Sequence, residues 1–225
     1  MPVEGVVFDP GAWNDYPGHK YREYKSAVFP TQEPPASPTT TAWDISHARR
    51  YVDVFTALVR DAKILHLEFP SQIVLRKLAN QFTYSVFNGN FELPLFSNFW
   101  DGVDGWYRVN YAKRLGYGYA PGDLSIAALG GGYAFLASGN EDMKQLYIRL
   151  FEMVTTGSVS EKDWLKKHFS GNRYKNYQRF RLPLFIHQSL DEMNTTETIL
   201  FLDFIPSLCR IHGLPMKNII LQTTN

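Results

Sequence analysis

The sequence has little cysteine, because Cys209 is the only one among its 225 residues. An intramolecular disulfide is therefore excluded, and with it the class of small disulfide-stapled scaffolds. Cys209 lies in an apolar stretch, whereas a reactive thiolate needs a cationic and partly exposed setting. We expect this side chain to be a small buried hydrophobe and not a nucleophile.

The sequence also lacks an excess of charge of either sign, and it lacks long apolar runs. Lys and Arg number 23 and Asp and Glu 22, so no overall field steers the protein to nucleic acid or to an anionic bilayer. The uncharged run 124–137 has 14 residues, fewer than the roughly 20 that cross a bilayer. The first residues carry neither the basic nor the apolar region of a secretory signal. We expect a cytoplasmic protein with no membrane span.

Several motifs of nucleotide, metal and hydrolase chemistry are missing from the sequence. There is no P-loop, no GxGxxG between a strand and a helix, no HExxH, no CxxC pair and no GxSxG. His66 and Glu68 form a His-x-Glu pair, but the PCxxC segment of a zinc deaminase is absent. The six histidines are scattered without metal-ligand spacing. The sequence therefore predicts no metal site and identifies no cofactor.

Helical periodicity dominates the chain after residue 42. Amphipathic helices are predicted over 44–62 with Asp44 as N-cap and over 71–88. Two more are predicted over 140–154 with Asn140 as N-cap, and over 160–169 with a Ser160–Asp163 capping box. Two further segments, 124–137 and 195–212, are apolar nearly all round and are predicted to be buried helices. Three consecutive glycines, 130–132, lie inside the first of them and indicate a break or a close backbone approach. The predicted fold is mainly α, an irregular multi-helix domain around these two buried helices with little β structure.

Residues 1–42 have a different composition. Seven of them are prolines, which interrupt any helix, yet Trp13, Tyr16, Tyr21, Tyr24 and Phe29 are too many aromatics for a free linker. We therefore expect residues 1–42 to form an extended N-terminal arm packed on the body, and residues 43–225 to form a single mainly α-helical domain.

The segment 99–119 is the first candidate for a functional site. It mixes aromatic rings, both signs of charge and four bend-permitting glycines. This mixture is typical of a pocket for a polar, ring-bearing small molecule, phosphorylated or not, whether the protein only binds it or is an enzyme. The predicted ligand-binding residues are Trp100, Asp101, Asp104, Trp106, Tyr107, Arg108 and Tyr119. Asp101 and Asp104 are weak candidates for acid–base catalysis. The alternative is an aromatic plug in the helix bundle, with each Asp forming a turn.

The segment 166–181 is the second candidate, because its cations alternate with aromatic rings and it contains no acidic residue. Such a composition is typical of a phosphate-binding or single-strand-binding surface, and the alternative is a solvated basic loop. The candidate phosphate or nucleic-acid contacts are Lys166, Lys167, Arg173, Lys175, Arg179 and Arg181.

Three classes of function stay open on the sequence. The first is a protein that binds a small molecule at 99–119. The second is a protein-interaction module in which the aromatic arm and that loop contact a partner chain. The third, less favoured in a chain of nearly balanced charge, is binding of RNA or single-stranded DNA through 166–181.

Overall fold

We describe a computed structural model, in which residues 4–9, 19, 21–25, 42–109, 118–130 and 132–169 are placed. In these residues the elements follow in the order α1 (Ile45–Leu65), α2 (Gln72–Gln81), η3 (Phe82–Val86), η5 (Asp123–Ser125), α3 (Ile126–Gly130), η6 (Tyr133–Gly139), α4 (Glu141–Thr155) and α5 (Val159–Phe169). The β structure in this part of the chain consists of isolated bridges. The predicted mainly α fold is confirmed, while the second predicted buried helix, 195–212, lies outside the described residues.

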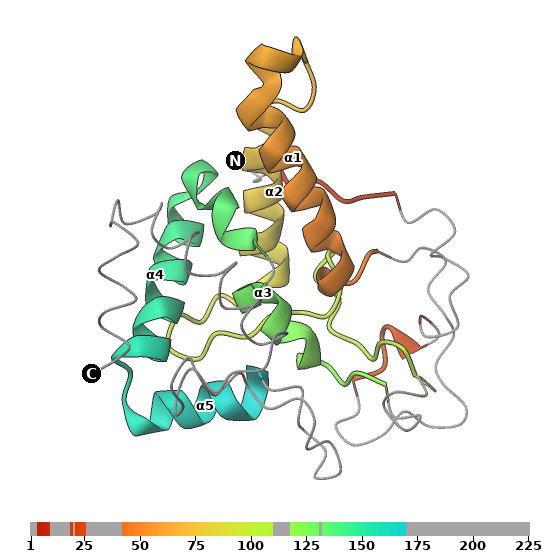
Figure 1. Cartoon of the computed structure of the whole chain (residues 1–225). Coiled ribbons are helices and arrows are strands. Elements are labelled where there is room, and N and C mark those ends of the chain that lie inside the picture. Colours follow the sequence, from red (N-terminus) through yellow and green to blue (C-terminus); the bar gives the residue numbers. More distant parts are fainter. Residues whose placement is uncertain are drawn as a thin grey trace, which may run out of the picture.

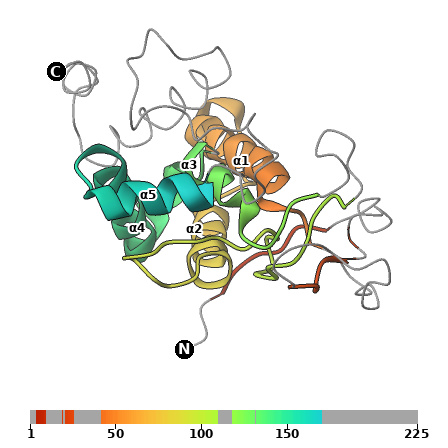
Figure 2. The same cartoon turned by 90° about the horizontal axis from the view of Figure 1, so that it is seen from below.

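The helices form an irregular bundle. α1 and α2 pass side by side at its centre, α4 stands to one side, and α5 lies across the lower end of α4 (Figure 1). Seen from below, the loop that follows η3 first runs beside α4 and α5, and its later part lies on the opposite side of the bundle, beside the described residues of the N-terminal arm (Figure 2). Among the described residues, no helix is both long and apolar enough to cross a membrane.

Two of the predicted N-caps are confirmed by hydrogen bonds. The Asp44 carboxylate accepts from the Ser46 amide at the start of α1, and the Asn140 side chain accepts from the Met143 amide at the start of α4. Each bond satisfies a backbone donor that has no partner within its helix. α4 buries Leu146 and Leu150 as its apolar stripe predicts, whereas Phe151 and Val154 on the same stripe are only partly buried.

The capping box of α5 lies two residues before its predicted position. The Ser158 hydroxyl accepts from the Glu161 amide, and the Glu161 carboxylate accepts from the Ser158 amide and hydroxyl. The Ser160–Asp163 prediction was therefore wrong in register, because Ser158 and Glu161 have the same spacing and start the helix at Val159.

The apolar run 124–137 is buried as predicted, but it is not one continuous helix. Its 3₁₀ turn η5 and helix α3 end at Gly130, and a second 3₁₀ segment, η6, begins at Tyr133. Gly132 between them has a φ of 75°, which a residue with a side chain rarely adopts. A Cβ at this position would also stand 2.4 Å from the Asp53 carboxylate. The glycines therefore mark a break in the helix.

An aromatic stack forms the centre of the core. The Phe82 ring lies 4.4 Å from the Tyr133 ring, and the Trp100 ring lies on Tyr133 at 5.8 Å with an interplanar angle of 16°. The Tyr133 hydroxyl donates to the Ile45 carbonyl and the Tyr147 hydroxyl to the Ala128 carbonyl, so both buried phenols have partners. This stack joins η3, η6 and the loop after η3 to the first turn of α1.

The described residues of the N-terminal arm contact the body. The Phe8 ring stacks on Tyr51 at 4.4 Å, and Trp100 Nε1 donates to the Val6 carbonyl at 2.7 Å. Further along, Arg22 is buried and forms an ion pair with Asp101. These contacts fit an arm that packs on the body, while the division at residue 42 stays a prediction.

Candidate functional site

Most aromatic residues of the first candidate segment lie inside the protein. Trp100, Trp106 and Tyr107 are at most 1% exposed, and Tyr119 is partly buried and paired with Tyr107 through two backbone hydrogen bonds. Residues 110–117 of this segment are outside the described part. The described rings therefore form core rather than a flat exposed patch.

The two aspartates of the segment hold backbone in place. Asp104 Oδ1 accepts from the amides of Asn98 and Gly122, at 3.1 and 2.7 Å. Asp101 accepts from the Val103 amide and pairs with Arg22 of the arm. These are the contacts of turn-forming carboxylates. An acid–base role for either aspartate stays a prediction, and these contacts give it no support.

Arg108 is the predicted site residue with the most unusual backbone. Its φ is +52°, in the left-handed region that residues other than glycine rarely adopt. Its Nε donates to the Tyr107 hydroxyl at 2.9 Å, and its guanidinium carbon lies 5.4 Å from the centre of the Tyr107 ring. Arg108 is only partly buried, so its guanidinium lies at the edge of the core. Residues held in strained conformations gather at functional sites.

The fold brings a histidine and a carboxylate to the same ring. Asp44 is fully buried, and its Oδ2 lies 2.7 Å from Nδ1 of His47, one turn further along α1. The His47 ring lies 6.4 Å from the Tyr107 ring and 6.4 Å from the Trp43 ring. The His47 side chain is 15% exposed and Trp43 is partly exposed. Tyr107 is therefore the common neighbour of His47 and Arg108.

The electrostatics of this cluster follow from burial. Burial and the nearby Asp44 carboxylate raise the pKa of Tyr107, so its phenol stays neutral. His19 of the arm packs against the Phe99 and Tyr107 rings, and burial lowers the pKa of its imidazole to about 4. The Arg22 charge acts in the same direction, while the charge of Asp44 acts in the opposite one. His19 is thus a neutral core residue near pH 7.

The chemistry available to the cluster is that of an oriented imidazole. With the Asp44 carboxylate accepting from Nδ1–H, the imidazole lone pair lies on Nε2. This is how a general base is held in position, with a buried carboxylate behind it. Arg108 supplies a planar cation that can fork onto a carboxylate or phosphate. We name this group, Trp43, Asp44, His47, Tyr107 and Arg108, the α1–loop cluster.

Sequence reasoning found part of this cluster. Tyr107 and Arg108 were singled out by composition, and Asp44 was expected only as a helix cap. His47 and Trp43 were missed, because the signal lies in the contact between the first turn of α1 and a loop about 60 residues later. The available signal in the sequence was a predicted N-cap Asp three residues before a His.

The second candidate segment is described only at its start. Lys166 and Lys167 lie in the last turn of α5, where cations interact favourably with the helix dipole, and Lys166 pairs with Asp163 at 3.4 Å. Arg173, Lys175, Arg179 and Arg181 lie outside the described residues. Nucleic-acid binding through this stretch stays a prediction.

No group of three or more His, Cys, Asp or Glu side chains in the described ranges is arranged to hold a metal ion. Comparisons of this chain with protein-family models, with curated proteins and with solved structures found no match.

Proposed function

We propose that this protein binds a small, polar, ring-bearing anion at the α1–loop cluster, and that His47 moves a proton on the bound molecule. The observation that carries the proposal is the pairing of His47 with the buried Asp44 carboxylate beside a ring that also holds Arg108. A base and a cation thus lie beside one phenol, and the Trp43 ring lies beside the base.

Each partly exposed member of the cluster has a role in this proposal. Arg108 binds the carboxylate or phosphate of the ligand through its guanidinium. Trp43 offers a flat apolar face for the ligand's ring. His47, oriented by Asp44, takes or returns a proton through Nε2. Tyr107 is buried and acts as a positioning residue, because it holds the Arg108 side chain through a hydrogen bond and ring contact.

Binding is tested by titrating a panel of sugar acids, sugar phosphates and nucleoside monophosphates, with the neutral sugars and nucleosides as comparators. Tryptophan fluorescence is the readout. Arg108→Gly is the informative variant, because glycine adopts the same φ without strain while the guanidinium is lost. We expect an anion of the panel to bind and Arg108→Gly to weaken it by about tenfold or more, since hydrogen bonds to charged groups contribute roughly 1.5–3 kcal/mol.

His66→Gly is the matched control. His66 also has a φ of +52°, but it ends α1 at the opposite end of the helix from Asp44. This variant relieves the same backbone strain and should leave binding unchanged. The proposal fails if no anion of the panel binds, or if Arg108→Gly binds as tightly as the wild type.

Proton transfer is tested separately in deuterated water. With a bound sugar acid, a general base exchanges the C–H next to the carboxylate for C–D, which proton NMR detects as a lost signal. We expect exchange in the wild type and none in His47→Gln. Binding without exchange would reduce the function to recognition of the anion.

A further inference from the structure

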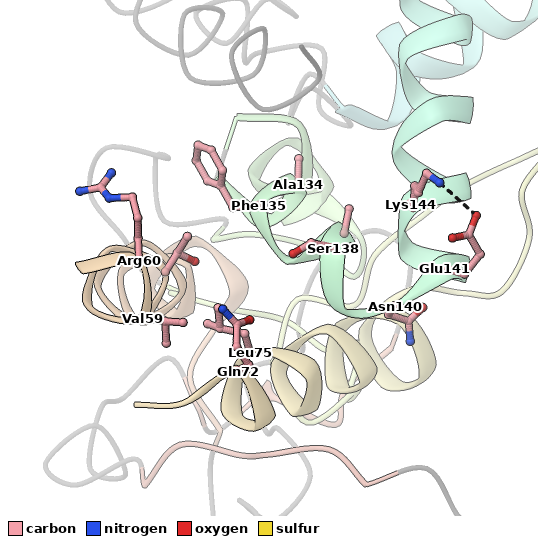
Figure 3. Close-up of a pocket in the computed structure, with 12 residues that line it drawn as sticks. Val59, Arg60, Gln72, Leu75, Ala134, Phe135, Ser138, Asn140, Glu141 and Lys144 are labelled. Atoms are coloured by element: carbon pink, nitrogen blue, oxygen red, sulfur yellow. Dashed lines mark ion pairs between the residues drawn. The ribbon is translucent and has the colours of Figure 1, made fainter. Parts of the chain in front are cut away.

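A cleft opens on another side of the bundle, between α1, α2, η6 and the start of α4. Its volume is about 570 Å³, within the range of small-molecule sites. Figure 3 shows the side chains that border it, with Val59 and Arg60 of α1 on one side and Ser138 of η6 and Lys144 of α4 on the other. The α1 residues involved begin at Thr56, roughly 18 Å along the helix from Asp44, so this cleft is separate from the α1–loop cluster.

The inner walls of the cleft are apolar. Leu75, Ala134 and Ala137 are at most 7% exposed, and Val59 and Phe135 are partly exposed beside them. A ring or short alkyl chain bound here would leave water for an apolar surface, at a gain of about 25 cal/mol per Å².

Hydrogen-bonding groups are set into these apolar walls. Gln72, Ser138 and Asn140 border the cleft, and so does Thr56. The Thr56 hydroxyl is buried and has no hydrogen-bond partner among the described residues. Because an unpaired buried hydroxyl is costly, a polar group of a bound molecule that reaches the Thr56 hydroxyl would remove this cost.

Two cations lie at opposite ends of the cleft, Arg60 on α1 and Lys144 on α4 (Figure 3). Arg60 is held by the neighbouring Asp61, and Lys144 by Glu141 at 3.5 Å. Both pairs are largely exposed and therefore weak, so either cation can turn to a bound anion at little cost. Among the described residues that line the cleft, Glu141 is the single carboxylate beside two cations, so this part of the lining carries an excess of positive charge.

We propose that this cleft is a second binding site, for a small amphipathic anion: a carboxylate or phosphate monoester on an aromatic ring or short alkyl chain. Arg60 or Lys144 binds the anionic group, the apolar walls cover the ring or chain, and Thr56 bonds a polar atom of the ligand. The proposal does not depend on the function proposed for the α1–loop cluster.

The experiment titrates phenyl phosphate and benzoate into the full-length protein. Inorganic phosphate, an anion without a ring, and benzyl alcohol, a ring without an anion, are the probes for each half of the ligand. Isothermal titration calorimetry measures the affinity. We expect phenyl phosphate or benzoate to bind more tightly than either half. The proposal is overturned if neither phenyl phosphate nor benzoate binds at millimolar concentration. It is also overturned if both bind no more tightly than inorganic phosphate.

Variants locate the site. Ser138 is exposed at the edge of the cleft, so Ser138→Trp should fill it without disturbing the core and should abolish binding. Arg60→Ala or Lys144→Ala should weaken binding by about tenfold, as expected for a lost charged hydrogen bond. Lys63→Ala, which removes an exposed cation of α1 that does not line the cleft, should not. Because phenyl phosphate and benzoate are also ring-bearing anions, each variant is measured in the Arg108→Gly background, which removes binding at the α1–loop cluster and separates the two sites. Unchanged affinity in Ser138→Trp would place the anion elsewhere and overturn the proposal.

Thr56→Val tests the unpartnered hydroxyl. The valine side chain has nearly the same shape, so the empty protein should unfold at the same or a higher temperature, while phenyl phosphate binds more weakly. A loss of stability would show that the hydroxyl already has a partner, and would remove Thr56 from the site.

Discussion

The two ends of α1 both carry apolar side chains but have different surroundings in the structure. At the first end, Ile45, Ala48 and Val52 are fully buried under the loop after η3 and under η6. At the far end, where α1 extends beyond the rest of the bundle (Figure 1), Ile64 and Leu65 are 79% and 51% exposed. The difference shows that apolar character alone does not bury a residue of a helix. At 3.6 residues per turn, Ile64 and Leu65 lie about 100° or more round α1 from the three buried residues, outside the face that packs.

The largest expected effect is on the packing at the first end. Ile45→Ala should lower the free energy of unfolding by about 2–5 kcal/mol, because it empties a fully enclosed volume. Ile64→Ala removes the same atoms from an exposed position and should change it by less than about 0.5 kcal/mol. Urea denaturation of the two variants measures both values. Equal losses would mean that the far end of α1 is covered in solution.

The second prediction concerns the pH dependence of stability and tests the burial of His19, which packs against Phe99 and Tyr107. The pKa of His19 is about 4 in the folded protein and 6.5 in a solvated chain. Between these values the unfolded chain binds a proton that the folded protein does not, so stability must fall as the pH falls from 6.5 to 4. The full loss is about 3 kcal/mol. Urea midpoints at several pH values measure it, and His19→Leu should flatten the slope in this window. Parallel slopes would contradict the buried position of His19.

The third prediction compares the two caps of α1. Asp44→Ala removes the N-cap bond and the partner of His47, and should cost about 2 kcal/mol. His66→Gly at the C-cap should instead stabilise the protein by up to about 1 kcal/mol, because glycine adopts a positive φ freely. Thermal unfolding distinguishes the opposite signs. A neutral Asp44→Ala would mean that the buried carboxylate does not stabilise the fold.

The smallest effect is expected at the cleft. Arg60→Ala should change the free energy of unfolding by less than about 0.5 kcal/mol, because its pair with Asp61 is largely exposed. A larger loss would show that Arg60 is part of the fold and would weaken its assignment to a ligand.

Local signals predicted the helices well. Asp44 and Asn140 cap α1 and α4 because their side chains serve amides only two or three residues away, which a sequence window contains. The capping box of α5 was misplaced because two Ser-to-acid pairs have the same spacing, and the pair that forms the box is Ser158 with Glu161. The glycines at 130–132 left open a break or a close approach, and Gly132 shows both.

The candidate sites could be predicted only in part. Composition drew attention to Trp100, Trp106 and Tyr107, but large aromatic side chains fill a core as readily as they line a pocket. It was the contact with the first turn of α1 that joined Tyr107 to His47. The cleft was not predicted at all, because Thr56 and Arg60 have no special pattern in the sequence and become neighbours of Lys144 only through helix packing.

The side chain of Asn98 has a consequence for how the molecule opens. Its Nδ2 donates to the carbonyls of Gly105 and Ala120, its Oδ1 accepts from the Leu124 amide, and its backbone carbonyl accepts from the Ile45 amide. One fully buried residue thereby connects the two described parts of the loop with η5 and α1. If any one of these segments opens to water, buried polar groups of the others lose their hydrogen-bond partners. The segments should therefore unfold cooperatively, as a single unit in native-state hydrogen exchange.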